Sequence, residues 1–496
     1  MPQPTLRTDW EGPPPQAAGR KVVMERLTPL AAAFIDAEDE DGTTSMAIGS
    51  MAVFAGPAPV FEDFVRMIET RLPTIPRYRQ ILRTVPLDLA PPAWVDDPGF
   101  DVRWHIRNTA LPSPGGPAEI GRLISRVMSR RMDRRRPLWE YWFCEGLAGG
   151  RWALLSKLHH SMADGVSGTD LYRLVLEPTP QPSPAVPDDP SAQVDGVPAG
   201  PASALSFAAS AAWDLARTPL VGARALGTAL LSPQQLIHQA GQTVSGLLTM
   251  ASALVPLEVS SLNGPLDGSR RYAWTQVSLQ DIRTVRKGLG GSVNDVALAA
   301  VTGGLRRLLL SRGEEPTAHM VRSMVPVSMR KPGAESIPDN RVSTMYPYLP
   351  VDLADPAARL AAVQERLRAR RSAGEPEAGA AMTAIAAYGP FPPVSLGMRV
   401  GFHLPQHCIA TVTTNVPGPR TTLYAMGRQL QEILPYVPLA NRVRIGVAIF
   451  SYRDVLTFGV TADYDTVPDL EVLTTGISSS MTELVAAADH AVGVAT

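Results

Sequence analysis

The segment LHHSMADG, residues 158–165, contains the side chains of this sequence that are best suited to acid–base chemistry. A neutral imidazole near pH 7 can take a proton from a hydroxyl as that hydroxyl attacks a carbonyl, so His159 and His160 are candidate bases. The carboxylate of Asp164 can fix a histidine tautomer or hold the loop by pairing with an arginine, and the sequence leaves both roles open. Gly165 allows a sharp turn or the close approach of a substrate. The doubled histidine and the adjacent glycine make this more specific than an H-x-x-x-D spacing alone.

Other catalytic signatures are missing from the sequence. There is no G-x-S-x-G nucleophile elbow, no P-loop and no H-E-x-x-H zinc motif. The run GLGG at 288–291 follows a predicted helix and not a strand, which favours a helix end over a phosphate loop. No further histidine or cysteine lies near His159, His160 and Asp164 at metal-ligand spacing, so we predict no metal site. Cys144 and Cys408 cannot form a disulfide framework, and two buried thiols are the simplest interpretation.

The composition excludes several classes of protein. The chain has 496 residues, 46 Lys plus Arg and 47 Asp plus Glu, and a net charge of −1, which is not the basic excess of a nucleic-acid binder. Apolar residues make up 45% and charged residues 19%, which excludes a wholly disordered chain and indicates apolar surfaces or an internal cavity. The first residues lack the apolar core of a secretory signal, and no apolar run reaches the roughly 18 residues of a membrane span. We therefore expect a cytoplasmic protein whose membrane contact is peripheral.

The strongest boundary in the chain is a proline-rich segment. Residues 178–202 contain eight prolines in 25 positions, which is typical of a linker and not of a packed element. Residues 1–21 are expected to be a loose tail, and 203–256 an Ala/Leu-rich helical connector that packs on a domain or rests on lipid. The remaining ranges, 22–177 and 257–496, are then two lobes.

Apolar periodicity predicts that strands alternate with helices on both sides of this linker. The expected helices are 61–72, 118–130, 279–288, 293–311, 356–371 and 469–488. The expected strands are 151–158, 272–278, 320–328, 342–350 and 408–414, with a hairpin over 442–463. Ser292 and Asp295 resemble a capping box at the start of 293–311. The pattern favours an α/β fold of two lobes, each a mixed sheet flanked by helices.

The sequence also resembles a known family. HHxxxDG is the motif of the coenzyme A-dependent acyltransferase superfamily, which includes chloramphenicol acyltransferases and the condensation domains of peptide synthetases. The flanking segments narrow the resemblance to the bacterial wax ester synthase/diacylglycerol acyltransferase family, over about residues 25–490. These segments are RLTPLAAAFIDAE (26–38), RLPTIPRYRQ (71–80), WVDDPGFDVRWHIR (94–107), RPLWEYWFCEGL (136–147), VNDVALAAVTGGLRRLL (293–309), NRVSTMYPYLP (340–350) and TNVPGP (414–419). Thr414 departs from the serine that is more frequent in the family, but it keeps a hydroxyl.

The resemblance implies an enzyme that moves a fatty acyl group from acyl-CoA to diacylglycerol or to a long-chain alcohol. It implies two chloramphenicol-acetyltransferase-like lobes with a substrate tunnel at their interface. His160 is then the general base, His159 a supporting residue, and Asp164 a structural residue that points toward an arginine. Because a thioester is already activated, acyl-CoA is a substrate and no cofactor is expected.

Three further motifs have both a structural and a functional interpretation. Pro137-Leu138-Trp139 is either a buried turn or part of the active-site wall. Asn294-Asp295 either caps a helix or brings an amide to the oxyanion or the acceptor. Thr414-Asn415 ends a strand at a turn, and the resemblance places it along the tunnel. A cluster of arginines is either a solvated surface or a site for CoA phosphates or anionic lipid, and it consists of Arg130, Arg131, Arg134, Arg135 and Arg136.

Two alternative functions remain open at this point. One is a condensation-type enzyme that uses carrier-bound acyl donors and shares HHxxxDG. The other is a catalytically idle lipid-body protein on the same fold. The flanking segments disfavour the first, and the intact His160, Asp164 and Gly165 disfavour the second.

Overall fold

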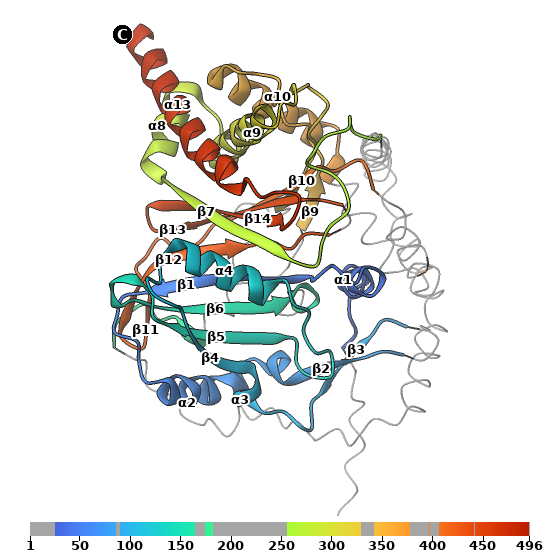
Figure 1. Ribbon diagram of the computed structural model, residues 1–496, viewed down its shortest axis with the longest axis vertical. Helices are drawn as coiled ribbons and strands as arrows, with labels where there is room; N and C mark the ends of the chain where they lie inside the picture. The colour runs from blue at the N-terminus through green and yellow to red at the C-terminus, as the bar shows by residue number, and fades with distance from the viewer. Residues whose placement is uncertain are drawn as a thin grey trace, which may run out of the picture.

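The computed structural model describes residues 25–85, 90–163, 174–181, 255–328, 342–376, 396, 406–440 and 442–495. Within these ranges the chain forms two six-stranded mixed sheets and a small two-stranded sheet (Figure 1). The predicted α/β architecture of two sheet-containing lobes is confirmed. Most of the predicted connector and linker, residues 182–254, lies outside the described residues, as do 1–24.

The first sheet has the strand order β11-β12-β1-β6-β5-β4. Its strands pair antiparallel except for β4 and β5, which are parallel. They are β1 (Ala47–Phe54), β4 (Ile106–Ala110), β5 (Trp139–Glu145), β6 (Trp152–His159), β11 (Tyr424–Ala425) and β12 (Arg428–Tyr436). Strands β11 and β12 come from the far side of the proline-rich linker. The division between the sheets therefore does not coincide with the predicted division into 22–177 and 257–496.

The second sheet has the order β7-β14-β13-β10-β8-β9, with parallel pairs at β10 and antiparallel pairs elsewhere. Its strands are β7 (Arg270–Ser278), β8 (Ser323–Ser328), β9 (Val342–Met345), β10 (Thr411–Val416), β13 (Ile445–Tyr452) and β14 (Val455–Asp463). Prolines at 347 and 350 explain why β9 is shorter than the predicted 342–350, because proline has no N–H for a strand ladder. Strands β2 (Gln80–Arg83) and β3 (Ala93–Asp96) form the small sheet.

The helices follow local signals in the sequence. They are α1 (Pro29–Glu40), α2 (Phe61–Arg71), α3 (Val102–His105), α4 (Pro117–Met128), α8 (Leu279–Leu289), α9 (Val293–Ser311), α10 (Pro356–Ser372) and α13 (Leu470–Ala495). Helix α9 has the predicted bounds, and its capping box is present: the Ser292 hydroxyl accepts from Asp295 N, and the Asp295 carboxylate accepts from Ser292 N. Helix α8 ends at Gly290 with φ of 77°, so GLGG is a helix end as predicted. Helices α8, α9, α10 and α13 gather beside the second sheet (Figure 1).

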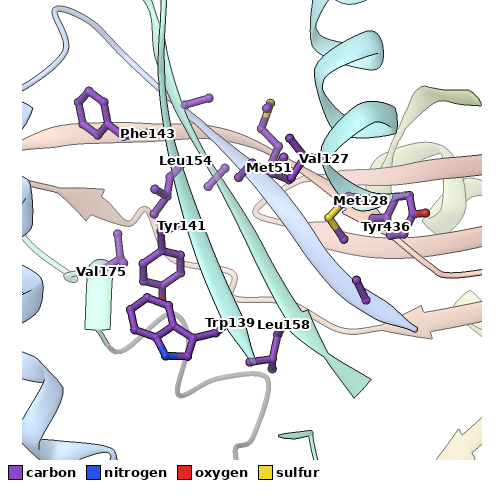
Figure 2. Close-up of a cluster of buried hydrophobic side chains, with 14 of the residues drawn as sticks. Met51, Val127, Met128, Trp139, Tyr141, Phe143, Leu154, Leu158, Val175 and Tyr436 are labelled. Carbon is purple, nitrogen blue, oxygen red and sulfur yellow. The ribbon is translucent and has the colours of Figure 1, made fainter. Parts of the chain in front are cut away.

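Each large sheet has its own apolar core. In the first lobe, the aromatic side chains of β5 and β6 pack with Phe61 and Phe64 of α2, while Val127 and Met128 of α4 and Tyr436 of β12 lie on the other face of the sheet (Figure 2). Phe143 and Trp152 stack there with ring centroids 5.0 Å apart. Cys144 is buried in this core, as predicted, whereas Cys408 is half-buried. The aromatic packing gives β6 a rigid base, which matters because β6 carries the histidine motif.

The two lobes contact each other where β14 passes β12. Tyr272 of β7 donates from its hydroxyl to the carbonyl of Pro435 on β12, at 2.9 Å. A Cβ atom on Gly459 of β14 would lie only 1.9 Å from the same carbonyl oxygen and 2.6 Å from the Tyr272 hydroxyl. Glycine is therefore required at position 459 for this approach.

We expect Gly459→Ala to force β12 and β14 apart and to destabilise the protein by about 1–3 kcal/mol, as overpacking does. The midpoint of thermal unfolding measures this effect. Gly268→Ala is the matched control, because a Cβ atom there meets nothing within 4 Å. Equal midpoints for the two variants would contradict the steric argument.

Candidate active site

The HH pair lies where strand β6 ends and a short 3-10 turn, η5 (His160–Met162), begins. The backbone is held on both sides of this junction. His159 N donates to the carbonyl of Leu138 at 3.0 Å, and His160 N donates to the carbonyl of Met46 at 2.9 Å. Both neighbouring strands thus fix the position of the two histidines. Ala47 of β1 pairs with His159, and β5 pairs with β6 on the other side. Asp164 and Gly165, the other predicted members of the motif, lie outside the described residues.

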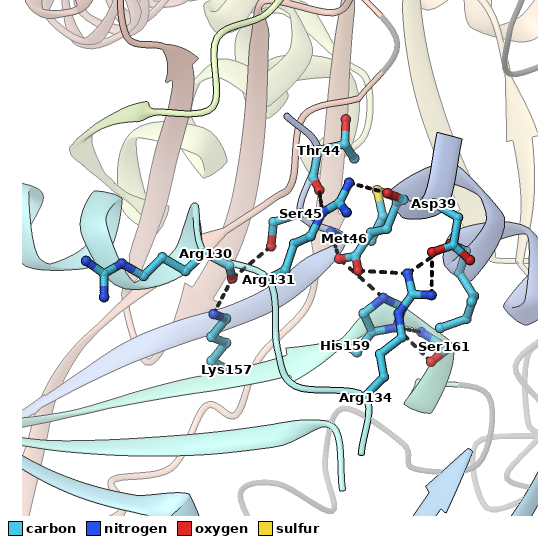
Figure 3. A network of polar contacts seen from close by, with 12 residues as sticks. Asp39, Thr44, Ser45, Met46, Arg130, Arg131, Arg134, Lys157, His159 and Ser161 are labelled. Carbon is cyan, nitrogen blue, oxygen red and sulfur yellow. Dashed lines mark hydrogen bonds and ion pairs between the residues drawn. The ribbon is translucent and has the colours of Figure 1, made fainter. Parts of the chain in front are cut away.

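The side chain of His159 is buried, with 1% of its surface exposed. Its Nδ1 accepts from Ser161 N at 3.1 Å and lies 2.7 Å from the Ser161 hydroxyl (Figure 3). Its Nε2 lies 3.4 Å from Oε1 of Glu38. The ring is enclosed by fixed polar groups, which suits a supporting residue better than one that meets a substrate.

Glu38 is a buried carboxylate at the end of α1. Burial by itself would raise its pKa, but the bond and charge of His159, the N–H of Met46 and the charge of Arg134 outweigh burial and hold the pKa at about 2. Met46 N donates to Oε1 at 2.6 Å, and Arg134 Nη2 lies 3.3 Å from Oε2. Glu38 is therefore ionised at neutral pH, next to the imidazole of His159.

His160 is more accessible than His159 and is half-buried. Its imidazole stacks on the ring of Phe34, with centroids 3.8 Å apart and planes 27° from parallel. Phe34 lies one turn before Glu38 on α1, so one helix contacts both histidines. The stacking restrains the orientation of the His160 ring while part of it stays exposed.

The segment Pro137-Leu138-Trp139 lies in the core of the first lobe. Trp139 donates from Nε1 to the carbonyl of Tyr78 at 2.8 Å and stacks on His105, with centroids 4.5 Å apart. Burial lowers the pKa of His105 to about 4, so this ring is neutral, and its Nδ1 lies 2.8 Å from the carbonyl of Trp139. These contacts are those of a buried turn, the structural interpretation of the segment. Its link to the site is the Leu138 carbonyl, which accepts from His159 N.

The other predicted site residues form a group in the second lobe. Asn294 lies in the first turn of α9 and Asn415 near the end of β10, and the Asn415 amide donates to Oδ1 of Asn294 at 3.3 Å. The structure thus brings together two motifs that are far apart in the sequence. Asp295 is occupied by the helix cap, and Thr414 is half-buried and pairs with Ala448 of β13.

Two arginines of the cluster, Arg131 and Arg134, are bound within the chain. Arg131 donates from Nε to the carbonyl of Thr44 at 2.9 Å, and its Nη2 donates to the carbonyls of Glu38 and Asp41 (Figure 3). Arg134 binds Oδ1 of Asp39 at 2.6 Å in addition to Glu38. Both arginines therefore tie the loop after α4 to α1, a role that neither sequence interpretation included.

The remaining arginines of the cluster also have contacts within the chain. Arg135 pairs with Asp133 at 3.0 Å, and the guanidinium of Arg136 lies 4.5 Å from the ring centre of Trp104. The carbonyl of Arg130 accepts from the ammonium of Lys157 and from the hydroxyl of Ser45. Arg131 and Arg134, with the backbone carbonyl of Arg130, thus support α1 and β6, whereas the side chain of Arg135 is 90% exposed.

Within the part of the chain that the structure describes, no group of three or more His, Cys, Asp or Glu side chains could hold a metal ion. No described helix is long and apolar enough to cross a membrane. A small pocket between α9 and α10 is lined by Gly291, Asp295, Gln364, Leu367, Arg368 and Arg371. The tunnel between the lobes stays a prediction.

Sequence reasoning did not identify Phe34 or Glu38 individually. A local signal for their helix exists: Thr28 followed by Pro29 is typical of a helix start, and the Thr28 hydroxyl does accept from Ala31 N at 3.1 Å. Nothing in the local pattern indicates that the far end of this helix meets the HH turn.

Solved structures share this fold. The wax ester synthase/diacylglycerol acyltransferase from Marinobacter aquaeolei VT8 superposes with a TM-score of 0.62 at 24% identity, covering 94% of this chain and 100% of that chain. The first condensation domain of the calcium-dependent antibiotic synthetase superposes with a TM-score of 0.56 at 13% identity, covering 95% and 97%. The two-lobed architecture is therefore shared by enzymes that differ widely in sequence.

Sequence comparison shows to which family of this fold the chain belongs. The model described as "Wax ester synthase/diacylglycerol acyltransferase catalytic domain" matches residues 27–297, and that described as "WS/DGAT C-terminal domain" matches 339–485. The chain is 40% identical over 470 residues to "Probable diacyglycerol O-acyltransferase tgs1" of Mycobacterium tuberculosis, covering 93% of this chain and 96% of that one. The protein is thus an acyltransferase of the two-lobed class. It belongs to the wax ester synthase/diacylglycerol acyltransferase family, as the sequence motifs predicted.

Lys157, two residues before His159, offers a test of the buried network. Its ammonium donates to the carbonyls of Val127 at 2.9 Å and Arg130 at 2.5 Å, and burial lowers its pKa from 10.5 to about 8. Between pH 8 and 10.5 the unfolded chain holds more of this proton than the folded one, so stability should rise with pH in this window.

We expect the free energy of unfolding of the wild type to rise relative to that of Lys157→Met between these pH values. The gain should approach about 3 kcal/mol, measured by denaturant unfolding at each pH. Parallel pH curves for the two proteins would show that Lys157 is not held in this way.

Proposed function

We propose that this enzyme transfers a long-chain fatty acyl group from acyl-CoA to the hydroxyl of diacylglycerol or of a long-chain alcohol. The observation that carries the proposal is the half-buried imidazole of His160, which is fixed at the end of β6 in a chain of this family. The relative from Mycobacterium tuberculosis, named for its action on diacylglycerol, supports that acceptor.

The proposed reaction is a direct transfer within a ternary complex. The imidazole of His160 takes the proton of the acceptor hydroxyl as its oxygen attacks the thioester carbonyl carbon. A C–O bond forms, the C–S bond breaks, and the CoA thiolate leaves and takes the proton back from His160. Residues of the protein supply the base and position the two substrates, and the activated thioester supplies the driving force.

The other predicted residues take supporting roles in this proposal. His159 fixes the turn, Gly165 allows the turn or the approach of substrate, and Asp164 holds the loop through an arginine. The amide nitrogen of Asn294 is a candidate donor to the tetrahedral oxyanion, because its carbonyl oxygen already accepts from Asn415. Thr414 and Asn415 are then proposed to line the tunnel, with Pro137, Leu138 and Trp139 behind the site.

The substrates also imply where the enzyme works. Diacylglycerol and long-chain alcohols reside in membranes or lipid droplets, so we propose peripheral contact of a cytoplasmic enzyme with such a surface. A mean hydropathy of zero and a charged fraction of 19% are compatible with such contact.

The deciding experiment gives the purified enzyme palmitoyl-CoA with diacylglycerol and hexadecanol in competition, followed by lipid analysis. Triacylglycerol, wax ester or both should form, and their ratio defines the acceptor preference. A parallel reaction with carrier-bound palmitate tests the condensation alternative, and it should give no ester. No ester from palmitoyl-CoA would refute the proposal, and an acyl-enzyme that accumulates without acceptor would refute the direct transfer.

We expect His160→Ala to lower kcat for ester formation by roughly 10²–10⁴-fold, the usual contribution of a general base, while the protein stays folded. His490→Ala, at an exposed position on α13, is the matched control and should retain wild-type turnover. Ester formation and circular dichroism are measured for both variants. Wild-type turnover by folded His160→Ala would remove His160 from the mechanism.

A further inference from the structure

Helix α1 touches both histidines of the motif with side chains one turn apart. Phe34 stacks on the ring of His160, and Oε1 of Glu38 lies 3.4 Å from Nε2 of His159. Residues four apart on a helix share one face, so the helix presents an aromatic ring and a carboxylate to the HH turn together.

The hydrogen bonds around His159 define its tautomer. Ser161 N can only donate, so Nδ1 of His159, 3.1 Å away, must accept. In the neutral ring the proton is then on Nε2, which faces the Glu38 carboxylate. At 3.4 Å this contact is longer than a usual hydrogen bond, but an ionised carboxylate favours the Nε2–H form at that distance.

Glu38 also reaches His160 through the backbone. Its Oε1 accepts from Met46 N at 2.6 Å, and the carbonyl of Met46 accepts from His160 N at 2.9 Å. One carboxylate therefore holds the side chain of the first histidine and the strand that anchors the second.

The position of Glu38 is itself braced. Arg134 contacts Oε2 of Glu38 at 3.3 Å and donates to the carbonyl of Ile35 at 3.2 Å, while Arg131 binds the carbonyls that follow α1 (Figure 3). Asp39, the next residue, also pairs with Arg134, at 2.6 Å, but its side chain is 54% exposed. Two adjacent acids thus share one arginine, and of the two Glu38 is the one with contacts to His159 and Met46.

We propose that Glu38 and Phe34 are positioning residues for acyl transfer: Glu38 sets the tautomer of His159 and anchors the turn, and Phe34 orients the imidazole of His160. The inference rests on the proposed function, because it assigns these residues to the same base. Neither residue is assigned a contact with substrate. Their effect should fall on the catalytic step and not on binding, because a misplaced base slows proton transfer.

The test compares Glu38→Gln with Asp39→Asn in the full chain, using palmitoyl-CoA and the acceptor that the wild type prefers. Glu38→Gln keeps the size of the side chain and removes the charge. We expect its kcat to fall roughly ten-fold or more, with KM for both substrates within about two-fold of the wild type. Asp39→Asn should keep the wild-type kcat.

Phe34→Leu is the second variant, and it retains an apolar side chain on α1 while it removes the stacked ring. Its kcat should fall about three-fold or more at unchanged KM. If Glu38→Gln does not fold, as judged by its melting transition, Phe34→Leu decides: a fall in kcat alone supports the proposal, and wild-type kcat overturns it.

The outcomes separate the two proposals. A wild type that makes no ester from palmitoyl-CoA refutes the proposed function. An active wild type with a folded Glu38→Gln of unchanged kcat overturns the positioning role alone. An equal loss in Asp39→Asn also overturns it, because the effect would then belong to the charge of the region and not to Glu38.

Discussion

The antiparallel pairing of β12 with β1 is the contact on which the arrangement of the molecule depends. Strand β12 follows the second-lobe strand β10 in sequence, yet Tyr436 pairs with Gly49 in the middle of the first sheet. On its other edge β1 pairs with β6, so that Ala47 lies opposite His159. The histidine turn is therefore set by strands from both halves of the chain, and the Tyr272 hydroxyl bond to Pro435 extends the same junction into the second sheet.

Buried polar and charged groups surround this turn. Glu38, Lys157 and His159 are nearly inaccessible, and Arg134 is only partly exposed. Burying such groups is costly unless each one meets fixed partners, and apolar side chains would fill the same space with less penalty. Oriented hydrogen-bond donors and acceptors fix the orientation of the side chains that they contact, whereas an apolar core mainly fills the space. This supports the view that the network serves the geometry of the histidines more than the stability of the lobe.

Local patterns in the sequence were sufficient for much of the fold. The bounds of α9, its capping box and the hairpin of β13 and β14 follow from caps, periodicity and turn residues, all of which act over a few positions. The exchange of β12 into the first sheet could not be predicted in this way, since strand order depends on pairing between distant segments. The same limit applies to Glu38, whose partner His159 is far along the chain, and to Arg131 and Arg134, which by composition resemble a solvated cluster. The motif itself identified both histidines, while Asp164 and Gly165 lie outside the described residues.

The place of β12 in the first sheet has a consequence for how the chain is made. During synthesis, β1 and β6 emerge early, but the neighbour that completes the far edge of β1 is not available until residue 436 has left the ribosome. Until then β1 presents unpaired N–H and C=O groups, which are a template for association with other chains. The segment matched by the catalytic-domain model, 27–297, ends before that strand. The catalytic half is thus a unit of sequence but not a unit of folding, and it reaches its final form only when nearly the whole chain is present.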